Sequence, residues 1–124
     1  MGSHAKELYG GCIKISLAMT ESPAWKALSG NQRALYLECL MQLFARECPG
    51  KDYPSKEEYQ NAFYMDWKNI KASAIYKSRA AFRKDMQKLV ETGFLDCIRK
   101  MNVGWLKSIY GYSNRWKDYQ GESE

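Results

Sequence analysis

The segment that decides the fold runs from residue 77 to residue 112 and reads KSRAAFRKDMQKLVETG (77–93), FLDCIRK (94–100), MNVG (101–104) and WLKSIYGY (105–112). Its first part predicts an amphipathic helix from about Lys77 to Thr92, because apolar side chains recur there at helical spacing. The apolar stripe consists of Phe82, Met86, Leu89 and Val90. Gly93 follows at once and predicts the left-handed residue that commonly ends a helix.

The second part of this segment predicts a β-hairpin. Two runs of β-prone residues, 94–100 and 105–112, flank a short connection that contains Asn102 and Gly104. Asn and Gly favour the left-handed backbone that tight hairpin connections require. We therefore expect a helix that ends at a glycine and leads directly into a hairpin.

A shorter helix and a turn are expected just before the long helix. Asp66 is a suitable N-cap for a helix that begins at Trp67, and residues 73–76 are expected to form a turn. A short helix, a turn, a longer basic helix and a hairpin follow one another in this order in winged helix-turn-helix proteins. The expected fold class is therefore α+β and mainly helical, a winged helix-turn-helix with a small antiparallel sheet.

The N-terminal part is expected to supply the remaining strand of the sheet. Apolar residues alternate with other side chains within residues 11–19, a pattern typical of a short half-buried strand. The alternating residues are Ile13, Ile15 and Leu17. Ser22 is then a suitable N-cap and Pro23 a suitable first residue for a short helix of about two turns.

Two further helices are predicted from capping-box patterns. Ser29 and Gln32 form the first pattern and predict a longer helix, which Pro49 and the glycine after it are expected to end. Ser55 begins the second pattern, in residues 55–58, which predicts a third helix that continues towards Tyr59 and Phe63.

One domain is expected over residues 11–119, because a chain of 124 residues is long enough for a single core. Residues 1–10 form an N-terminal segment whose first four residues, from Met1 to His4, match a cloning scar. Residues 120–124 contain no core-forming side chain and are expected to be a frayed tail.

The positive charge is concentrated in one segment. The chain carries a net charge of +5, and residues 67–107 alone carry 10 basic and 3 acidic side chains, a balance of +7. A localised basic patch attracts polyanions through counterion release. The alternative is a solvated, lysine-rich helix face with no partner.

Three motifs resemble those of known winged-helix proteins. Residues 89–95, LVETGFL, resemble the L-x-x-x-G-F-I junction between recognition helix and wing in many bacterial members. Residues 110–119, YGYSNRWKDY, are similar to the Y-x-x-S-x-x-W ending of small winged-helix proteins from Gram-positive plasmids and conjugative elements. Residues 22–29, SPAWKALS, are similar to the start of the related replication initiators.

This resemblance covers residues 11–119 and implies binding to double-stranded DNA at an origin of replication or transfer, or at an operator. Initiators usually carry a second domain after this one, and here the chain ends, so the resemblance favours an accessory or regulatory role. Winged-helix proteins often bind repeated or palindromic half-sites as dimers. The expected partners are therefore double-stranded DNA, a second copy of the chain in a homodimer, and replication or relaxosome proteins.

The candidate DNA-contacting residues lie on the long helix and in the hairpin. The full set is Lys77, Ser78, Arg79, Arg83, Lys84, Gln87, Arg99, Lys100, Asn102 and Lys107. Basic residues suit phosphates and base edges, and Gln87 suits adenine. Near the helix N-terminus, Lys77 and Ser78 suit a phosphate. There are two alternatives to these DNA contacts. Ser78 could serve only as a helix cap, and the basic hairpin could only protect a sheet edge from aggregation.

Catalysis, a cofactor and a metal site are not expected. The only histidine, His4, lies in the suspected scar, and the chain lacks a nucleophile elbow and a Gly-rich phosphate loop. No C-x-x-C pair is present, and Cys39 and Cys97 are expected to be buried free thiols. No apolar run approaches the roughly 18 to 20 residues that cross a bilayer. A cytoplasmic protein without membrane contact is therefore expected.

Two other functions remain open from the sequence. The first is a winged-helix adaptor in a replication or transfer complex, whose basic face meets an acidic protein and not DNA. The second is binding of single-stranded nucleic acid by base stacking on aromatic side chains. We expect core packing for the four tryptophans, Trp25, Trp67, Trp105 and Trp116.

Overall fold

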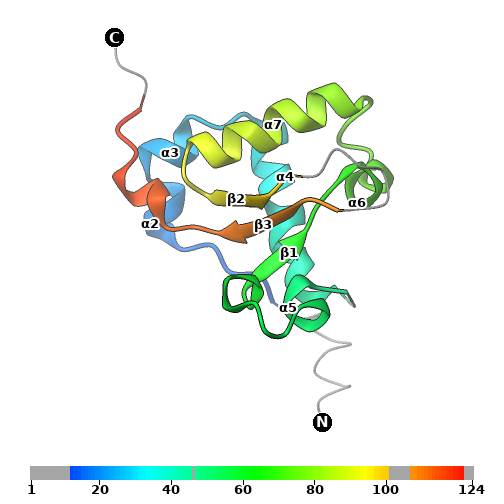
Figure 1. Cartoon of the computed structure of the whole chain (residues 1–124). Helices are drawn as coiled ribbons and strands as arrows, with labels where there is room; N and C mark the ends of the chain where they lie inside the picture. Colours follow the sequence, from blue (N-terminus) through cyan, green and yellow to red (C-terminus); the bar gives the residue numbers. More distant parts are fainter. Residues whose placement is uncertain (1–11, 46, 101–106, 122–124) are drawn as a thin grey trace.

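A three-stranded antiparallel sheet separates two hydrophobic clusters in the computed structural model, which describes residues 12–45, 47–100 and 107–121. The fold is α+β (Figure 1). The α-helices are α2 (Leu17–Thr20), α3 (Pro23–Lys26), α4 (Gly30–Met41), α5 (Pro49–Asp52), α6 (Trp67–Ile70) and α7 (Arg79–Glu91). The 3₁₀ helices are η1 (Gln42–Phe44), η2 (Glu57–Tyr59), η3 (Lys71–Ser73) and η4 (Arg115–Asp118). The strands are β1 (Ala62–Tyr64), β2 (Leu95–Arg99) and β3 (Ile109–Tyr112).

The strands are ordered β1-β3-β2, so that the third strand lies in the middle. Phe63 of β1 pairs with Tyr110 of β3, and Cys97 of β2 pairs with the same residue from the other side. The predicted hairpin strands are therefore confirmed as β2 and β3.

The two faces of the sheet are covered differently. On the inner face, Phe63 and Leu95 pack into the main core with buried residues of α4 and α7, such as Leu35 and Leu89. On the outer face, a second cluster of Tyr59, Ala62, Tyr64 and Ile109 packs with Tyr53 and Ile98. In Figure 1, α7 accordingly lies on one side of the strands and the α5 segment on the other.

The predicted helix starts are largely confirmed by their caps. Ser22 accepts a hydrogen bond from the Trp25 amide, with Pro23 in the first turn. Ser29 and Gln32 form a reciprocal capping box at the start of α4. These short-range hydrogen bonds satisfy amide groups that the helix itself cannot, which is why local sequence suffices to predict them.

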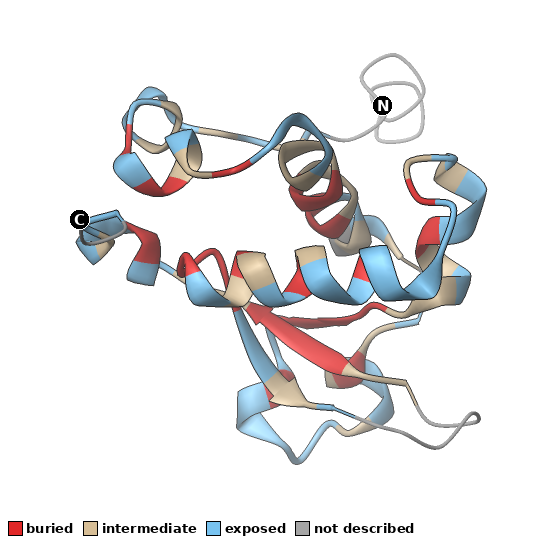
Figure 2. Ribbon diagram, turned by 90° about the horizontal axis from the view of Figure 1, so that it is seen from above, coloured by how far each residue is buried: buried red, intermediate tan, exposed pale blue. Residues whose placement is uncertain are grey.

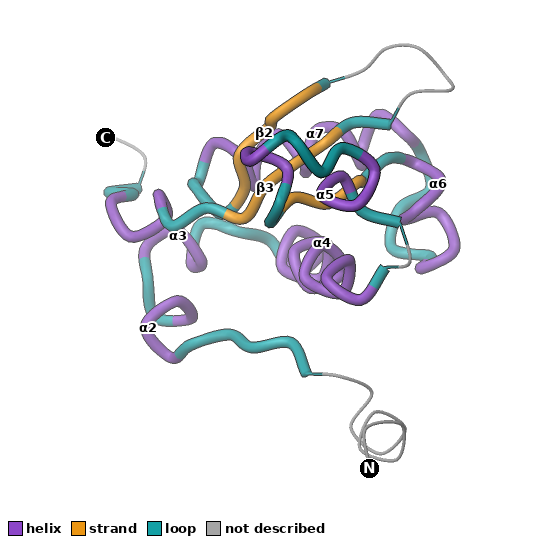
Figure 3. The backbone as a smooth tube through the Cα atoms, turned by 60° about the horizontal axis from the view of Figure 1, so that its bottom comes forward, coloured by secondary structure: helices purple, strands orange, loops and turns teal. Residues whose placement is uncertain are grey.

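The strand predicted within residues 11–19 is wrong. Residues 12–16 have no regular structure, and Leu17–Thr20 form α2 (Figure 3), capped by the Ser16 hydroxyl, which accepts from the Met19 amide. The sheet position expected for this segment belongs to β1, and Leu17 is 78% exposed. Ile13 and Ile15 pack against the core without a strand partner. Alternation alone cannot distinguish an extended arm from a strand, because pairing depends on a neighbour that the pattern does not contain.

The helix predicted from residue 55 is also wrong. Its first residues form only the short η2, which Ser55 does not cap, and the chain then becomes β1. The apolar run of β1 is buried on both faces, which favours a strand over an amphipathic helix. The strand that joins the β2–β3 hairpin in the sheet, β1, thus comes from the segment directly before α6.

The predicted end of the longer helix at Pro49 is wrong as well. Helix α4 ends at Met41 and continues as η1 to Phe44, whereas Pro49 is the first residue of α5. Proline lacks the backbone N–H that a helix interior needs as a hydrogen-bond donor, but it suits the first turn of a helix, where that N–H would have no partner. It therefore began a new helix here and did not end the old one.

Among the described residues, no helix combines the length and the apolar character needed to cross a membrane.

Candidate nucleic-acid interface

The outer face of α7 carries a row of exposed cations. Arg79 and Arg83 lie one turn apart, and Lys84 is adjacent, all three exposed, as is Lys77 before the helix. The opposite face buries the predicted stripe, of which Phe82 and Met86 lie in the core. Figure 2 shows α7 from above, with exposed residues along its outer side. The predicted helix and the division of its two faces are confirmed.

Asp85, the acidic residue in the middle of α7, points away from this row. Its carboxylate accepts hydrogen bonds from the Tyr76 hydroxyl at 2.6 Å and from the Gln32 side-chain amide at 2.9 Å. Two contacts from separate elements therefore fix α7 against α4 and against the turn before it. The same contacts turn the Asp85 carboxylate away from the row of cations, so that Glu91, near the helix end, is the exposed acidic residue of α7.

The turn between α6 and α7 is set by local geometry. Asp66 caps α6, as predicted, and the Asn69 side chain, which was not predicted to take part, completes a capping box by accepting from the Asp66 amide. After η3, Ala74 adopts the left-handed conformation with φ 63°, which is uncommon for a residue with a Cβ. Ser78 then caps α7 by accepting a hydrogen bond from the Ala81 amide. Ser78 therefore acts as the N-cap of α7, which is one of the two roles expected from the sequence.

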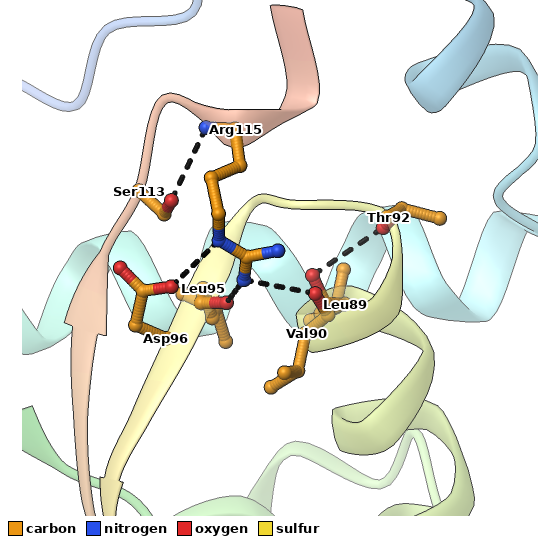
Figure 4. Close-up of polar contacts among 7 residues, drawn as sticks. All are labelled: Leu89, Val90, Thr92, Leu95, Asp96, Ser113 and Arg115. Carbon is orange, nitrogen blue, oxygen red and sulfur yellow. Dashed lines mark hydrogen bonds and ion pairs between the residues drawn. The ribbon is translucent and has the colours of Figure 1, made fainter. Parts of the chain in front are cut away.

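The junction between α7 and β2 is held by the C-terminal segment. Gly93 has φ +91°, as expected for a helix-ending glycine. Arg115 reaches across from η4 and donates to the carbonyl oxygens of Val90 at 3.0 Å and Leu95 at 2.8 Å (Figure 4). It also donates to the Asp96 carboxylate at 2.8 Å. One guanidinium thus binds both the end of the helix and the start of the strand.

The rest of the C-terminal motif packs on the same junction. The Ser113 amide donates to the Phe94 carbonyl, and the Trp116 amide donates to the Gly93 carbonyl, both at 3.0 Å. The Trp116 ring stacks on Phe94 with an angle of 10° between the planes. In the sequence, Ser113 and Trp116 were identified only through their resemblance to a known motif. No sequence pattern predicted that Arg115 joins the helix to the hairpin.

Grooves border α7 on both sides. One, about 620 Å³ in volume, lies between α7 and the turn that precedes α4, and Lys84, Gln87 and Ser29 are among its lining residues. The other, about 40 Å³, lies between α7 and the hairpin; Arg83 and Gln87 line it from α7, and Cys97 and Lys100 from the other side. Helix α7 is therefore a ridge with exposed cations between two grooves.

Two titratable groups in the smaller groove stay neutral near pH 7. Burial raises the pKa of Tyr110 to about 12, although Arg83 opposes this shift. Partial burial raises the pKa of the Cys97 thiol, while nearby Lys100 lowers it. Cys97 lies in β2 but is exposed, so its predicted burial is wrong; Cys39 is buried, as predicted. Cys97 lies on the α7 side of the sheet, but the groove between α7 and the hairpin leaves its side chain accessible to solvent.

The hairpin cations do not all lie on the α7 side. Lys100 does, but Lys107 lies on the outer face, where its ammonium is 2.9 Å from Glu47 and 5.3 Å from the Tyr64 ring centroid. The Arg99 guanidinium lies 5.6 Å from the Tyr53 ring centroid, also on the outer face. Asn102 lies outside the described residues. The structure therefore gathers the helix residues and Lys100, and separates Arg99 and Lys107 from them.

The described tryptophans contribute to packing. Trp116 is buried, and half-buried Trp25 and Trp67 pack against the main core; Trp105 lies outside the described residues. Trp25 contacts Phe94 edge-on, at 5.9 Å between centroids. These three rings therefore pack against the core, which agrees with the packing role expected for them.

Within residues 12–45, 47–100 and 107–121, no group of three His, Cys, Asp or Glu side chains is placed to hold a metal ion. No protein-family model, curated protein or solved structure was found to match the chain.

Proposed function

We propose that this chain is a winged helix-turn-helix protein that binds double-stranded DNA, with α7 in the major groove and the β2–β3 hairpin as the wing. The single observation that carries the proposal is the exposed cationic face of α7, formed by Arg79, Arg83 and Lys84. An accessory or regulatory role in plasmid or mobile-element replication, transfer or transcription, as the sequence resemblance implies, belongs to the same proposal.

The order of elements supports the proposal. Helix α4, strand β1, helix α6, helix α7 and the β2–β3 hairpin occur in this order, with the short η1, α5 and η2 between α4 and β1, and the hairpin pairs with β1 in one sheet. In a winged helix the first helix of the pair braces the second, whose outer face enters the groove. Here α6 and the turn after it precede α7, and Tyr76 in that turn is bound to Asp85.

The charge distribution gives the proposal a quantitative form. Five exposed cations lie on α7 or beside it: Lys77, Arg79, Arg83, Lys84 and Lys100. If each neutralises one phosphate, the logarithm of the binding constant should fall with the logarithm of salt concentration with a slope of about −4 to −5. The proposal assigns base contacts to Gln87, whose side chain is exposed on the same helix and donates a hydrogen bond to Glu91 at 3.4 Å.

A salt titration tests this proposal directly. A labelled random-sequence duplex of about 20 base pairs is titrated with protein at several salt concentrations, and fluorescence anisotropy gives the binding constants; the expected slope is that stated above. Lack of any duplex binding at low salt would contradict the proposal and favour a protein-binding adaptor. Tighter binding to oligo-dT than to a duplex of equal length would instead favour a single-strand binder.

Cys97 gives a built-in reporter of where the duplex binds. Because it lies in the groove between α7 and the hairpin, saturating duplex should slow its alkylation by N-ethylmaleimide several-fold. Exposed Cys12 lies outside that groove, and its alkylation should not change. Mass spectrometry of tryptic peptides measures both rates, at a pH above 8 because the thiolate is the reacting form. Equal protection of the two cysteines would place the duplex elsewhere.

A further inference from the structure

A β-bulge in β2 places Arg99 on the outer face of the sheet and Lys100 on the α7 face. The register between β2 and β3 passes from the pair Cys97–Tyr110 to the pair Arg99–Ile109, so that Ile98 has no partner of its own. A bulge of this kind adds one residue to a strand and changes which face the following side chains occupy.

The side-chain contacts follow this change residue by residue. Cys97 lines the groove on the α7 side. Ile98 packs in the outer cluster, and Arg99 lies over Tyr53 on that same outer face. Lys100 returns to the α7 side and lines the groove with Arg83. Under regular alternation Arg99 would share the face of Cys97, and Lys100 would point away. The bulge therefore decides which of the two cations joins the α7 face.

The outer face holds Arg99 in this place. Its guanidinium lies 5.6 Å from the centroid of Tyr53, which itself contacts Tyr59 edge-on at 5.4 Å. Its Nη2 donates to the Lys107 carbonyl at 3.2 Å, which ties β2 to the start of β3. Tyr53 belongs to the segment between α5 and η2, so residues far from the hairpin in sequence fix its base.

We propose that Arg99 is a positioning residue, whose docking on Tyr53 maintains the bulge and thereby presents Lys100 to the DNA beside α7. This inference rests on the proposed function, because it assigns the DNA contact to Lys100 and withholds it from Arg99. The Arg99 side chain would act through Lys100 and would not touch the duplex.

The test compares the single variants Lys100→Ala, Arg99→Ala and Tyr53→Ala with the double variant of residues 99 and 100. Losing one phosphate contact should weaken duplex binding about eightfold at 0.1 M salt and lower the magnitude of the salt slope by about one. All three single variants should show this loss, including Tyr53→Ala, which removes no charge. The double variant should lose no more than either single variant, because both act on one contact.

Two controls separate positioning from general damage. Tyr53→Phe keeps the ring under Arg99 and removes only the hydroxyl that bonds to the guanidinium, so it should lose much less affinity than Tyr53→Ala. Lys56→Ala removes an exposed cation from the same outer segment and should leave the affinity nearly unchanged. A loss of about 60-fold in the double variant, with normal binding by Tyr53→Ala, would mean that Arg99 contacts DNA itself and would overturn the inference. Unchanged binding by Lys100→Ala would also overturn it.

Hydrogen exchange distinguishes failure of this inference from failure of the proposed function. If the unaltered protein binds no duplex, the proposed function and the role of Lys100 both fail. The anchoring of the hairpin by Arg99 is still measurable: Arg99→Ala and Tyr53→Ala should each speed amide exchange in β2 and β3 several-fold, and Tyr53→Phe should have a much smaller effect. Unchanged exchange in the first two variants would show that Arg99 does not position the hairpin.

Discussion

Replacing Arg79, Arg83 and Lys84 together by alanine is expected to remove most of the duplex affinity while the fold persists. If each cation neutralises one phosphate, the combined loss is about 500-fold at 0.1 M salt, and the salt slope falls in magnitude by about three. Alanine is the best helix former, and the three side chains are exposed, so α7 should remain intact. Anisotropy measures the affinity, and circular dichroism with thermal unfolding checks the fold.

A second triple variant separates the site from the overall charge. Lys14, Lys51 and Lys56 are exposed cations outside α7 and the hairpin, and their replacement by alanine lowers the net charge by the same three units. This variant should keep most of the duplex affinity. Equal losses in the two triple variants would show that net charge alone drives association, and retained affinity in the α7 variant would place the DNA site elsewhere.

Gly93→Ala is expected to destabilise the whole protein by about 3 kcal/mol or more. Gly93 has φ +91°, a backbone conformation that residues with a Cβ rarely adopt. A Cβ placed there would also lie 2.5 Å from the Trp116 backbone nitrogen and 2.6 Å from the Arg115 carbonyl carbon. Because both neighbours are backbone atoms, relief would require η4 to leave the junction.

Thermal unfolding measures this effect, and the expected fall in Tm is at least about 10 °C for a domain of this size. Gly30→Ala is the matched control, because Gly30 is the first residue of α4 and a Cβ there meets nothing within 4 Å. That variant should unfold at nearly the same temperature as the unaltered protein or slightly above it. A similar Tm for Gly93→Ala would mean that the C-terminal segment does not hold the junction tightly.

The sequence by itself determined the elements whose hydrogen bonds and apolar contacts are local. The start of α4 at Ser29, the cap of α6 at Asp66 and the end of α7 at Gly93 were all predicted, because capping groups lie within a few residues of the amides they satisfy. The two faces of α7 were predicted for the same reason, since helical spacing fixes which side chains share a face. These features include the cationic row on which the proposed function depends.

Tertiary structure alone decided which segment completes the sheet and which hairpin cations accompany α7. Residues 62–64 took the position next to β3 that the alternating segment near Ile15 was expected to fill, because strand pairing depends on a distant partner. The bulge at Ile98 likewise turned Arg99 towards Tyr53, and Arg115 reached the end of α7 from the C-terminal segment. Such contacts join residues tens of positions apart in the sequence. They cannot be predicted from periodicity, because a periodic pattern depends only on residues that are close together in the chain.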